Sequence, residues 1–184
     1  MSLQRPPDSL PMTPDYLYHF SEVASIKRFV PQRVGVGPSD EKLVWAVDSA
    51  HCHQFYFPRD CPRVLLSKAS YTTPADVETF FGHTTATAIA AIESRWLERL
   101  RNTTIYRYTL LSDGFVLRNE SAGYWVSEYE CRPLEVEPIP DLMATLVDAG
   151  VELRILPSLA SMRDAVIEST VNFDIIRWRN AVTV

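Results

Sequence analysis

Short strand-like and helix-like segments follow one another in this chain without strict alternation, and this order limits the fold more than any other feature. Strand patterns cover residues 16–20, 43–47, 63–67, 104–111 and 151–156, with helical patterns between some of them. Strict strand–helix alternation would indicate a parallel sheet, whereas a mixed order favours the α+β class. We therefore predict one α+β domain over residues 15–184, with a mixed or mostly antiparallel sheet flanked by helices. We also predict that residues 1–14 form a flexible, proline-rich leader.

Several elements have distinct signals. Residues 89–100 carry the strongest helical pattern, because four large apolar residues recur there at steps of three and four. Asp113-Gly114 lies between two strand patterns and predicts a hairpin turn. Residues 31–42 contain two prolines and two glycines and predict a loop long enough to cover a neighbouring site. We also expect a helical turn after Ser21 and a helix from residue 48 or 49 to about residue 57. Thr73-Pro74 predicts the start of a short helix over residues 74–81, and Gly150 predicts the end of a helix over residues 140–149.

The charge balance argues against one large class of partner. The net charge is −5, whereas general nucleic-acid binding needs a basic face. The apolar runs are too short for a membrane span, and the first 15 residues lack the apolar segment of a signal peptide. Three cysteines without a CxxC pair favour the cytoplasm. A small nucleotide-like ligand and a homodimer are both compatible with this composition.

The first strand ends in a candidate binding or catalytic group. In Tyr18-His19-Phe20-Ser21, strand alternation places Tyr18 and Phe20 on one face and His19 and Ser21 on the other. If Tyr18 and Phe20 face the core, a neutral imidazole opposite them could bind a ribose hydroxyl or act as acid or base near neutral pH. The alternative is a structural histidine bound to a backbone carbonyl.

A second candidate region follows the strand at 43–47. Asp48 comes at the end of this strand, where it either caps the next helix or faces a ligand. Tyr56, Arg59 and Arg63 form an aromatic and cationic cluster, in which an aromatic could stack on a flat ring and an arginine could bind a phosphate. Core packing and a surface pair with Asp60 are the alternative interpretation.

Glu128 and Glu130 follow the aromatic strand Gly123-Tyr124-Trp125-Val126. Either glutamate could act as a general base or hold ribose hydroxyls, and on a strand the two share a face. The alternative is a solvated sheet edge that the acidic residues protect from further strand pairing.

A metal site receives little support from the sequence. His51, His53 and Cys61 are potential ligands, but their spacing does not match structural zinc patterns. No GxGxxG, P-loop, GxSxG or HExxH motif occurs, so no reaction is named by motif. Cys61 is available as a nucleophile only if a base lies beside it in the fold.

Four strings resemble a family of uncharacterised bacterial proteins: Leu17-Tyr18-His19-Phe20-Ser21, Val44-Trp45-Ala46-Val47-Asp48, the segment Phe57 to Val64, and Gly123-Tyr124-Trp125-Val126-Ser127. This resemblance covers nearly the whole chain after the leader and implies no known activity.

The order of parts is also distantly similar to that of ADP-ribosyltransferase-like domains, in which a histidine on the first strand is followed two residues later by a hydroxyl. The resemblance implies a split antiparallel sheet with NAD in its cleft. It implies that His19 holds the adenosine ribose, that Tyr56 stacks near the nicotinamide, and that Glu130 orients the reacting ribose. The chain departs from the pattern because Phe20 replaces the usual glycine and no serine-threonine-serine strand occurs.

Two interpretations of function follow. In the first, the protein is a nucleotide-using transferase of the ADP-ribosyl kind, with His19, Ser21, Asp48, Tyr56, Arg63, Glu128 and Glu130 as its site. In the second, it is a non-catalytic ligand-binding or interaction domain. There an exposed aromatic surface would form from Tyr106, Tyr108, Tyr124, Trp125 and Trp178.

Overall fold

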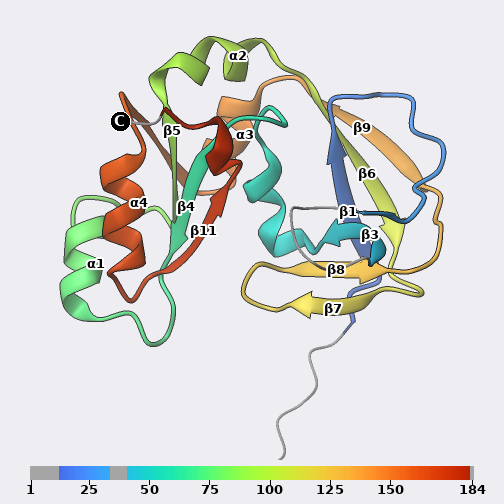
Figure 1. The fold of residues 1–184 in the computed structure, drawn as a ribbon, viewed down its shortest axis with the longest axis horizontal. Helices are drawn as coiled ribbons and strands as arrows, with labels where there is room; N and C mark the ends of the chain where they lie inside the picture. The colour runs from blue at the N-terminus through green and yellow to red at the C-terminus, as the bar shows by residue number, and fades with distance from the viewer. Residues whose placement is uncertain (1–12, 34–40, 183–184) are drawn as a thin grey trace, which may run out of the picture.

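Two β-sheets form the framework of the computed structural model, which describes residues 13–33 and 41–182 (Figure 1). The larger sheet has seven antiparallel strands in the order β7-β8-β3-β1-β6-β9, and β2 pairs with β3. Its strands are β1 (Tyr16–Ser21), β2 (Gln32–Arg33), β3 (Lys42–Val47), β6 (Ile105–Leu111), β7 (Val116–Asn119), β8 (Tyr124–Ser127) and β9 (Glu135–Ile139).

The smaller sheet has four strands in the order β10-β5-β4-β11. β10 runs parallel to β5, and the other two pairings are antiparallel. The strands are β4 (Arg63–Ser67), β5 (Ala88–Glu93), β10 (Val151–Leu156) and β11 (Asn172–Ile176). The predicted α+β class is therefore confirmed, with the strands divided between two sheets.

Short helices cover the smaller sheet and fill the space between the two sheets. Figure 1 shows α1 and α4 on the outer face of the smaller sheet and the first 3₁₀ helix, η1, between the sheets. The helices are η1 (Ser49–Phe55), α1 (Pro74–Phe81), η2 (Ser94–Trp96), α2 (Leu97–Asn102), α3 (Leu142–Asp148), α4 (Ala160–Ile167) and η3 (Trp178–Asn180). Among the described residues, no helix has the length and apolar character that crossing a bilayer requires.

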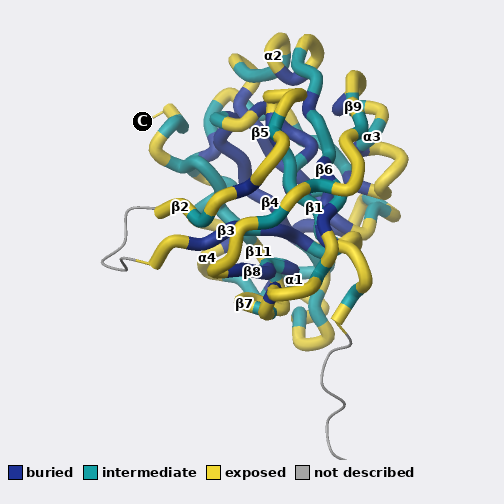
Figure 2. The backbone as a smooth tube through the Cα atoms, turned by 90° about the vertical axis from the view of Figure 1, so that its right-hand side faces the viewer, coloured by how far each residue is buried: buried dark blue, intermediate teal, exposed yellow. Residues whose placement is uncertain are grey.

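Three apolar clusters hold these layers together. One lies between the sheets and includes Val47, Leu65 and Ile92, a second lies under α1 and α4, and a third covers the other face of the larger sheet. Figure 2 shows the buried segments along the central strands and much of the exposed chain in outer loops and helices. The smaller sheet is thus buried on both faces, while the larger sheet packs on the first cluster with one face only.

The strongest helical prediction was wrong. Residues 88–93 form β5, which is completely buried, and helix begins only at η2 and α2. A strand covered on both faces has no polar alternation. Ile89 and Ile92 of this strand and Trp96 and Leu100 of the following helices therefore happen to have the spacing of one apolar helix face.

Other local predictions had mixed outcomes. The Asp113-Gly114 turn does not join paired strands, because β7 pairs with β8 and β6 lies between β1 and β9. No helix follows Ser21, and the helix after Asp48 is a 3₁₀ helix. Thr73 caps α1, and the predicted end of α3 at Gly150 is confirmed by its φ of 73°. Most of the predicted leader and of the loop at 31–42 lies outside the described residues.

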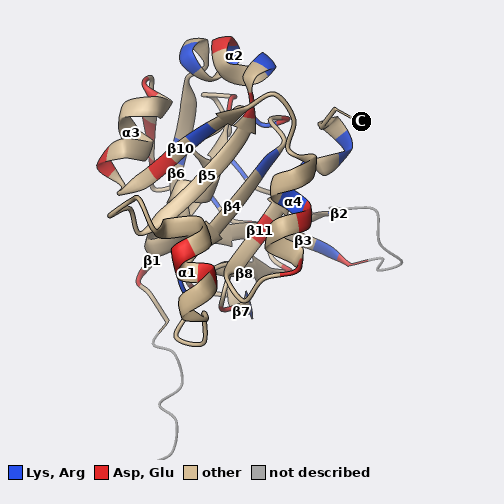
Figure 3. Cartoon of the chain, turned by 90° about the vertical axis from the view of Figure 1, so that its left-hand side faces the viewer, with Lys and Arg blue, Asp and Glu red and all other residues tan. Residues whose placement is uncertain are grey.

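Charged side chains are mixed in sign over the smaller-sheet side of the molecule. Figure 3 shows basic and acidic residues together on α2 and acidic residues on α1. The residues concerned are Glu98, Arg99 and Arg101 on α2, and Asp76 and Glu78 on α1.

Candidate functional site

The larger sheet opens between β1 and β3. β1 pairs with β6 at all six of its positions, from Tyr16 to Ser21, but with β3 only at Tyr18 opposite Val47. Beyond that pair, the histidine side chain replaces the missing ladder bond, because His19 Nδ1 lies 2.8 Å from the carbonyl oxygen of Trp45. The two strands therefore stay side by side while leaving a gap in the sheet.

This contact fixes the protonation pattern of His19. The Trp45 carbonyl can only accept, so Nδ1 carries the proton and Nε2 is an acceptor in the neutral ring. Burial lowers the pKa of the His19 imidazole, and the positive charge of Arg59 lowers it further, against an opposing effect of the Trp45 bond. His19 is therefore neutral near pH 7, and its Nε2 has no hydrogen-bond partner in the described part of the chain.

An aromatic pocket of about 350 Å³ occupies the gap. It is lined by Tyr18, His19, Phe20, Trp45, Ala46, Val47, Phe55 and Tyr124. Its rings support one another: Phe20 stacks on Phe55 with centroids 5.7 Å apart, and Tyr124 meets Trp45 edge-on at 5.9 Å. Rings held in this way offer rigid flat surfaces to a planar ligand.

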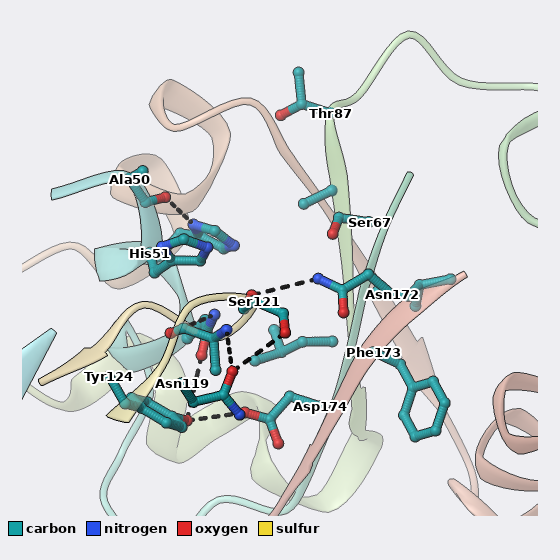
Figure 4. A pocket seen from close by; sticks show the side chains of 16 residues that line it. Ala50, His51, Ser67, Thr87, Asn119, Ser121, Tyr124, Asn172, Phe173 and Asp174 are labelled. Atoms are coloured by element: carbon teal, nitrogen blue, oxygen red, sulfur yellow. Dashed lines mark hydrogen bonds between the residues drawn. The ribbon is translucent and has the colours of Figure 1, made fainter. Parts of the chain in front are cut away.

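A polar cleft of about 320 Å³ lies between the two sheets (Figure 4). One wall comes from η1 and the turn between β7 and β8, and the other from β4, β5 and β11. The polar residues that line it are His51, His53, Gln54, Ser67, Thr87, Asn119, Ser121, Tyr124, Asn172 and Asp174. Tyr124 borders both cavities, so one side chain separates the aromatic pocket from the polar cleft.

Asp48 and His51 form a fixed pair beside the polar cleft. Asp48 Oδ1 accepts from the backbone N–H of His51 at 3.1 Å and lies 2.7 Å from its Nδ1. Gly123 packs closely on this pair, since a Cβ there would lie 2.2 Å from His51 Nδ1. The predicted capping role of Asp48 is thus present, and the same carboxylate also orients an imidazole.

The other predicted contact residues have mainly internal partners. Ser21 is buried, and its hydroxyl accepts from the backbone N–H of Val23 at 3.1 Å. Tyr56 is buried with its ring edge-on to Phe20, and Phe55 beside it lines the aromatic pocket instead.

Arg63 is buried and donates to the carbonyl oxygens of Gln54 and Cys61 at 2.9 and 3.0 Å. Burial lowers the pKa of its guanidinium to about 10, which leaves it charged at neutral pH. Its guanidinium also lies 5.0 Å from the ring centroid of Phe57. These contacts tie η1 to β4, and the predicted phosphate contact of Arg63 stays a prediction.

Glu128 and Glu130 are exposed after β8, and neither lines the aromatic pocket or the polar cleft. Glu130 lies 3.3 Å from Arg28 in a surface ion pair. Phe29, next to Arg28, meets the His19 ring at 4.5 Å and pairs with Cys131, next to Glu130. The glutamate thus belongs to the segment behind His19, and its catalytic assignment stays a prediction.

Neither a metal site nor a reactive thiol emerges from the described residues. Within 13–33 and 41–182, no three histidine, cysteine or acidic residues are grouped to hold a metal ion. Burial raises the pKa of the Cys61 thiol to about 12, so little thiolate forms near neutral pH.

The expected aromatic surface is also largely internal, because Tyr108 and Trp125 are buried.

Sequence reasoning missed Trp45, Phe55 and most of the polar cleft. Trp45 and Phe55 read as core residues, and the cleft combines three segments that are far apart in the chain. The one available signal was the position of Tyr124, which directly follows the turn after Asn119 that contains Ser121.

Comparison with known proteins places the chain in a family without giving it an activity. Residues 18–181 match the Family of unknown function (DUF6886). No curated protein and no solved structure matches the chain. These comparisons give no support to the ADP-ribosyltransferase resemblance or to a bacterial origin. Because the match spans most of the sequence, this protein belongs to the Family of unknown function (DUF6886).

Proposed function

We propose that the aromatic pocket binds the flat ring of a nucleotide, with NAD as the first ligand to test. We further propose that the protein is a transferase of the ADP-ribosyl kind. The observation that carries this proposal is the gap between β1 and β3, which is lined by aromatic rings and bordered by a neutral His19.

The pocket offers the contacts that a nucleotide ring and sugar require. Phe20, Phe55 and Trp45 present flat apolar surfaces for stacking. His19 Nε2 can accept a hydrogen bond from a ligand amide or hydroxyl, because Nδ1 is already committed to Trp45. Arg59 is exposed, and its charge acts on His19, so it is the candidate for a phosphate contact.

The transfer step requires a carboxylate near the reacting sugar, and Glu130 and Glu128 are our candidates for it. Glu130→Gln should retain NAD binding and lose turnover, because the substitution removes the negative charge and leaves the aromatic pocket unchanged. Glu128→Gln makes the same change two residues away on the same exposed segment, so the variant that binds NAD and loses turnover identifies which of the two glutamates acts in the transfer.

A binding-only role is the second candidate function. It is favoured by the exposed positions of both glutamates, which lie outside the lining of the aromatic pocket. If the wild type binds NAD but neither it nor any variant releases nicotinamide from the bound NAD, the binding-only role is selected over the transferase.

Thermal denaturation with NAD and with ADP-ribose tests the pocket directly. A ligand that binds only the folded state stabilises it by about 2.7 kcal/mol at a hundredfold excess over Kd. We expect Tm to rise for the wild type, and Phe55→Ala and His19→Ala to abolish the rise. Tyr71→Ala is the control, because Tyr71 is 68% exposed and lines neither cavity. A wild-type Tm that does not move at millimolar NAD would refute the proposal.

A further inference from the structure

The polar cleft between the sheets has the composition of a site for hydroxyl groups. Its walls carry imidazole, amide and hydroxyl side chains, which both donate and accept hydrogen bonds. We propose that it binds a neutral polyhydroxylated compound of monosaccharide size, at a site separate from the aromatic pocket. A sugar hydroxyl also donates and accepts, so it suits a wall of this kind better than a purely donating or purely accepting group does.

Three polar atoms on opposite walls are available to such a ligand. His51 Nε2, Ser67 Oγ and Asn172 Oδ1 have no hydrogen-bond partner within the described ranges 13–33 and 41–182. Figure 4 shows His51 on one side of the hollow and Ser67 and Asn172 on the other. A ligand between them would join η1 of one layer to β4 and β11 of the other.

The imidazole of His51 is preoriented as an acceptor. The ionised Asp48 carboxylate can only accept, so the 2.7 Å contact places a proton on Nδ1 and leaves Nε2 unprotonated in the neutral ring. The backbone N–H of His51 binds the same oxygen, and Gly123 packs closely against both side chains of the pair. An acceptor held in this way loses little conformational entropy when a ligand hydroxyl donates to it.

The charges of the lining favour a neutral ligand over an anion. Among the residues that the structure describes, no lysine or arginine lines the polar cleft, so a phosphate or carboxylate would enter without a cationic partner there. The carboxylate of Asp174 already accepts from the Tyr124 hydroxyl at 2.8 Å. The volume of about 320 Å³ lies at the small end of the ~300–1,000 Å³ usual for small-molecule pockets.

NMR titration of the ¹⁵N-labelled full chain with D-ribose tests the proposal. We expect amide shifts at Ser67, Ser121 and Asn172 that saturate by about 100 mM, since isolated sugars bind weakly. His51→Phe keeps a ring of similar size without the acceptor and should weaken binding about fivefold, the loss expected for one neutral hydrogen bond. Ser67→Ala should do the same, and it removes a hydroxyl that has no partner in the described fold.

His83→Phe is the matched control, because His83 is exposed and lines neither cavity. Its affinity for D-ribose should equal that of the wild type. If His51→Phe fails to fold, Ser67→Ala decides alone. The proposal is overturned if wild-type shifts do not localise to the cleft, if Ser67→Ala binds as the wild type does, or if ribose 5-phosphate binds more tightly than ribose. The amide shifts are read at Ser67, Ser121 and Asn172, none of which lines the aromatic pocket, so this result is independent of the proposed nucleotide pocket.

Discussion

At the scale of the residue, the geometry of His19 is compatible with both roles that the sequence left open. Its Nδ1 bond to the Trp45 carbonyl is structural, and its place in the lining of the aromatic pocket leaves Nε2 for the proposed ligand contact. The two are compatible because an imidazole has two distinct nitrogens, and fixing one defines what the other can do. The backbone contact therefore does not argue against a ligand contact here.

The lowered pKa of the His19 imidazole predicts a dependence of stability on pH. Below about pH 6.5 the unfolded chain binds a proton that the folded state resists, so the free energy of unfolding falls as the pH falls. His19→Phe removes the titrating group and keeps a ring against Phe29, so its stability should fall less over the same range.

Urea denaturation of both proteins between about pH 7 and pH 5 measures this difference. Burial also lowers the pKa of the His53 imidazole. His53 is present in both proteins and adds the same pH dependence to each, so the difference between their slopes reports His19. Equal slopes of stability against pH for the two proteins would contradict the prediction.

At the scale of the element, β5 shows how burial on both faces hides a strand. Its odd and even positions face different apolar clusters, with Ala90 and Ile92 toward the space between the sheets and Ile89 and Ala91 toward α1 and α4. A strand with this environment carries no alternation of polar and apolar residues.

Ala90→Leu tests the position of β5. Ala90 is completely buried in the cluster between the sheets, so three added carbon atoms should overpack it and cost about 1–3 kcal/mol of stability. Ala75→Leu on the exposed side of α1 is the control and should be nearly neutral. If residues 89–100 were the amphipathic helix of the sequence prediction, Ala90 would lie off its apolar stripe. A neutral Ala90→Leu would therefore support that helix over the strand.

At the scale of the whole molecule, the two sheets are joined by packing around η1 and by a polar bridge. Tyr124 of the larger sheet donates to Asp174 of the smaller sheet at 2.8 Å and lies 3.4 Å from Gln54 of η1. Burial, followed by the negative charge of Asp174, raises the pKa of the Tyr124 hydroxyl, which keeps it a donor. This bridge lies between the aromatic pocket and the polar cleft, so it holds both cavities in shape.

Tyr124→Phe should destabilise the fold by about 1–2 kcal/mol, because it leaves a half-buried carboxylate without its donor. Tyr106→Phe on β6 is the matched control, since the Tyr106 hydroxyl has no hydrogen-bond partner in the described fold. Midpoints of urea denaturation at one pH compare the two variants. Equal midpoints for Tyr124→Phe and Tyr106→Phe would show that the bridge contributes nothing.

The sequence by itself determined the local elements with strong signals. The start of α1 at Thr73-Pro74 and the end of α3 at Gly150 follow from backbone constraints that act within a few residues. The alternation in β1 likewise placed Tyr18 and Phe20 against the core and His19 on the opposite face. These features depend on neighbours in the chain, so sequence patterns report them.

Only the tertiary structure decided where those elements meet. The gap between β1 and β3 depends on how few positions of the two strands pair, and no local pattern encodes the extent of that pairing. Phe55, the last residue of η1, lines the aromatic pocket, whereas Tyr56 directly after it is buried with its ring edge-on to Phe20. The polar cleft brings residues 51, 67, 121 and 172 together across two sheets. Contacts between such distant segments arise from packing of the whole chain, which is the physical reason that the sequence located His19 but not the cavities around it.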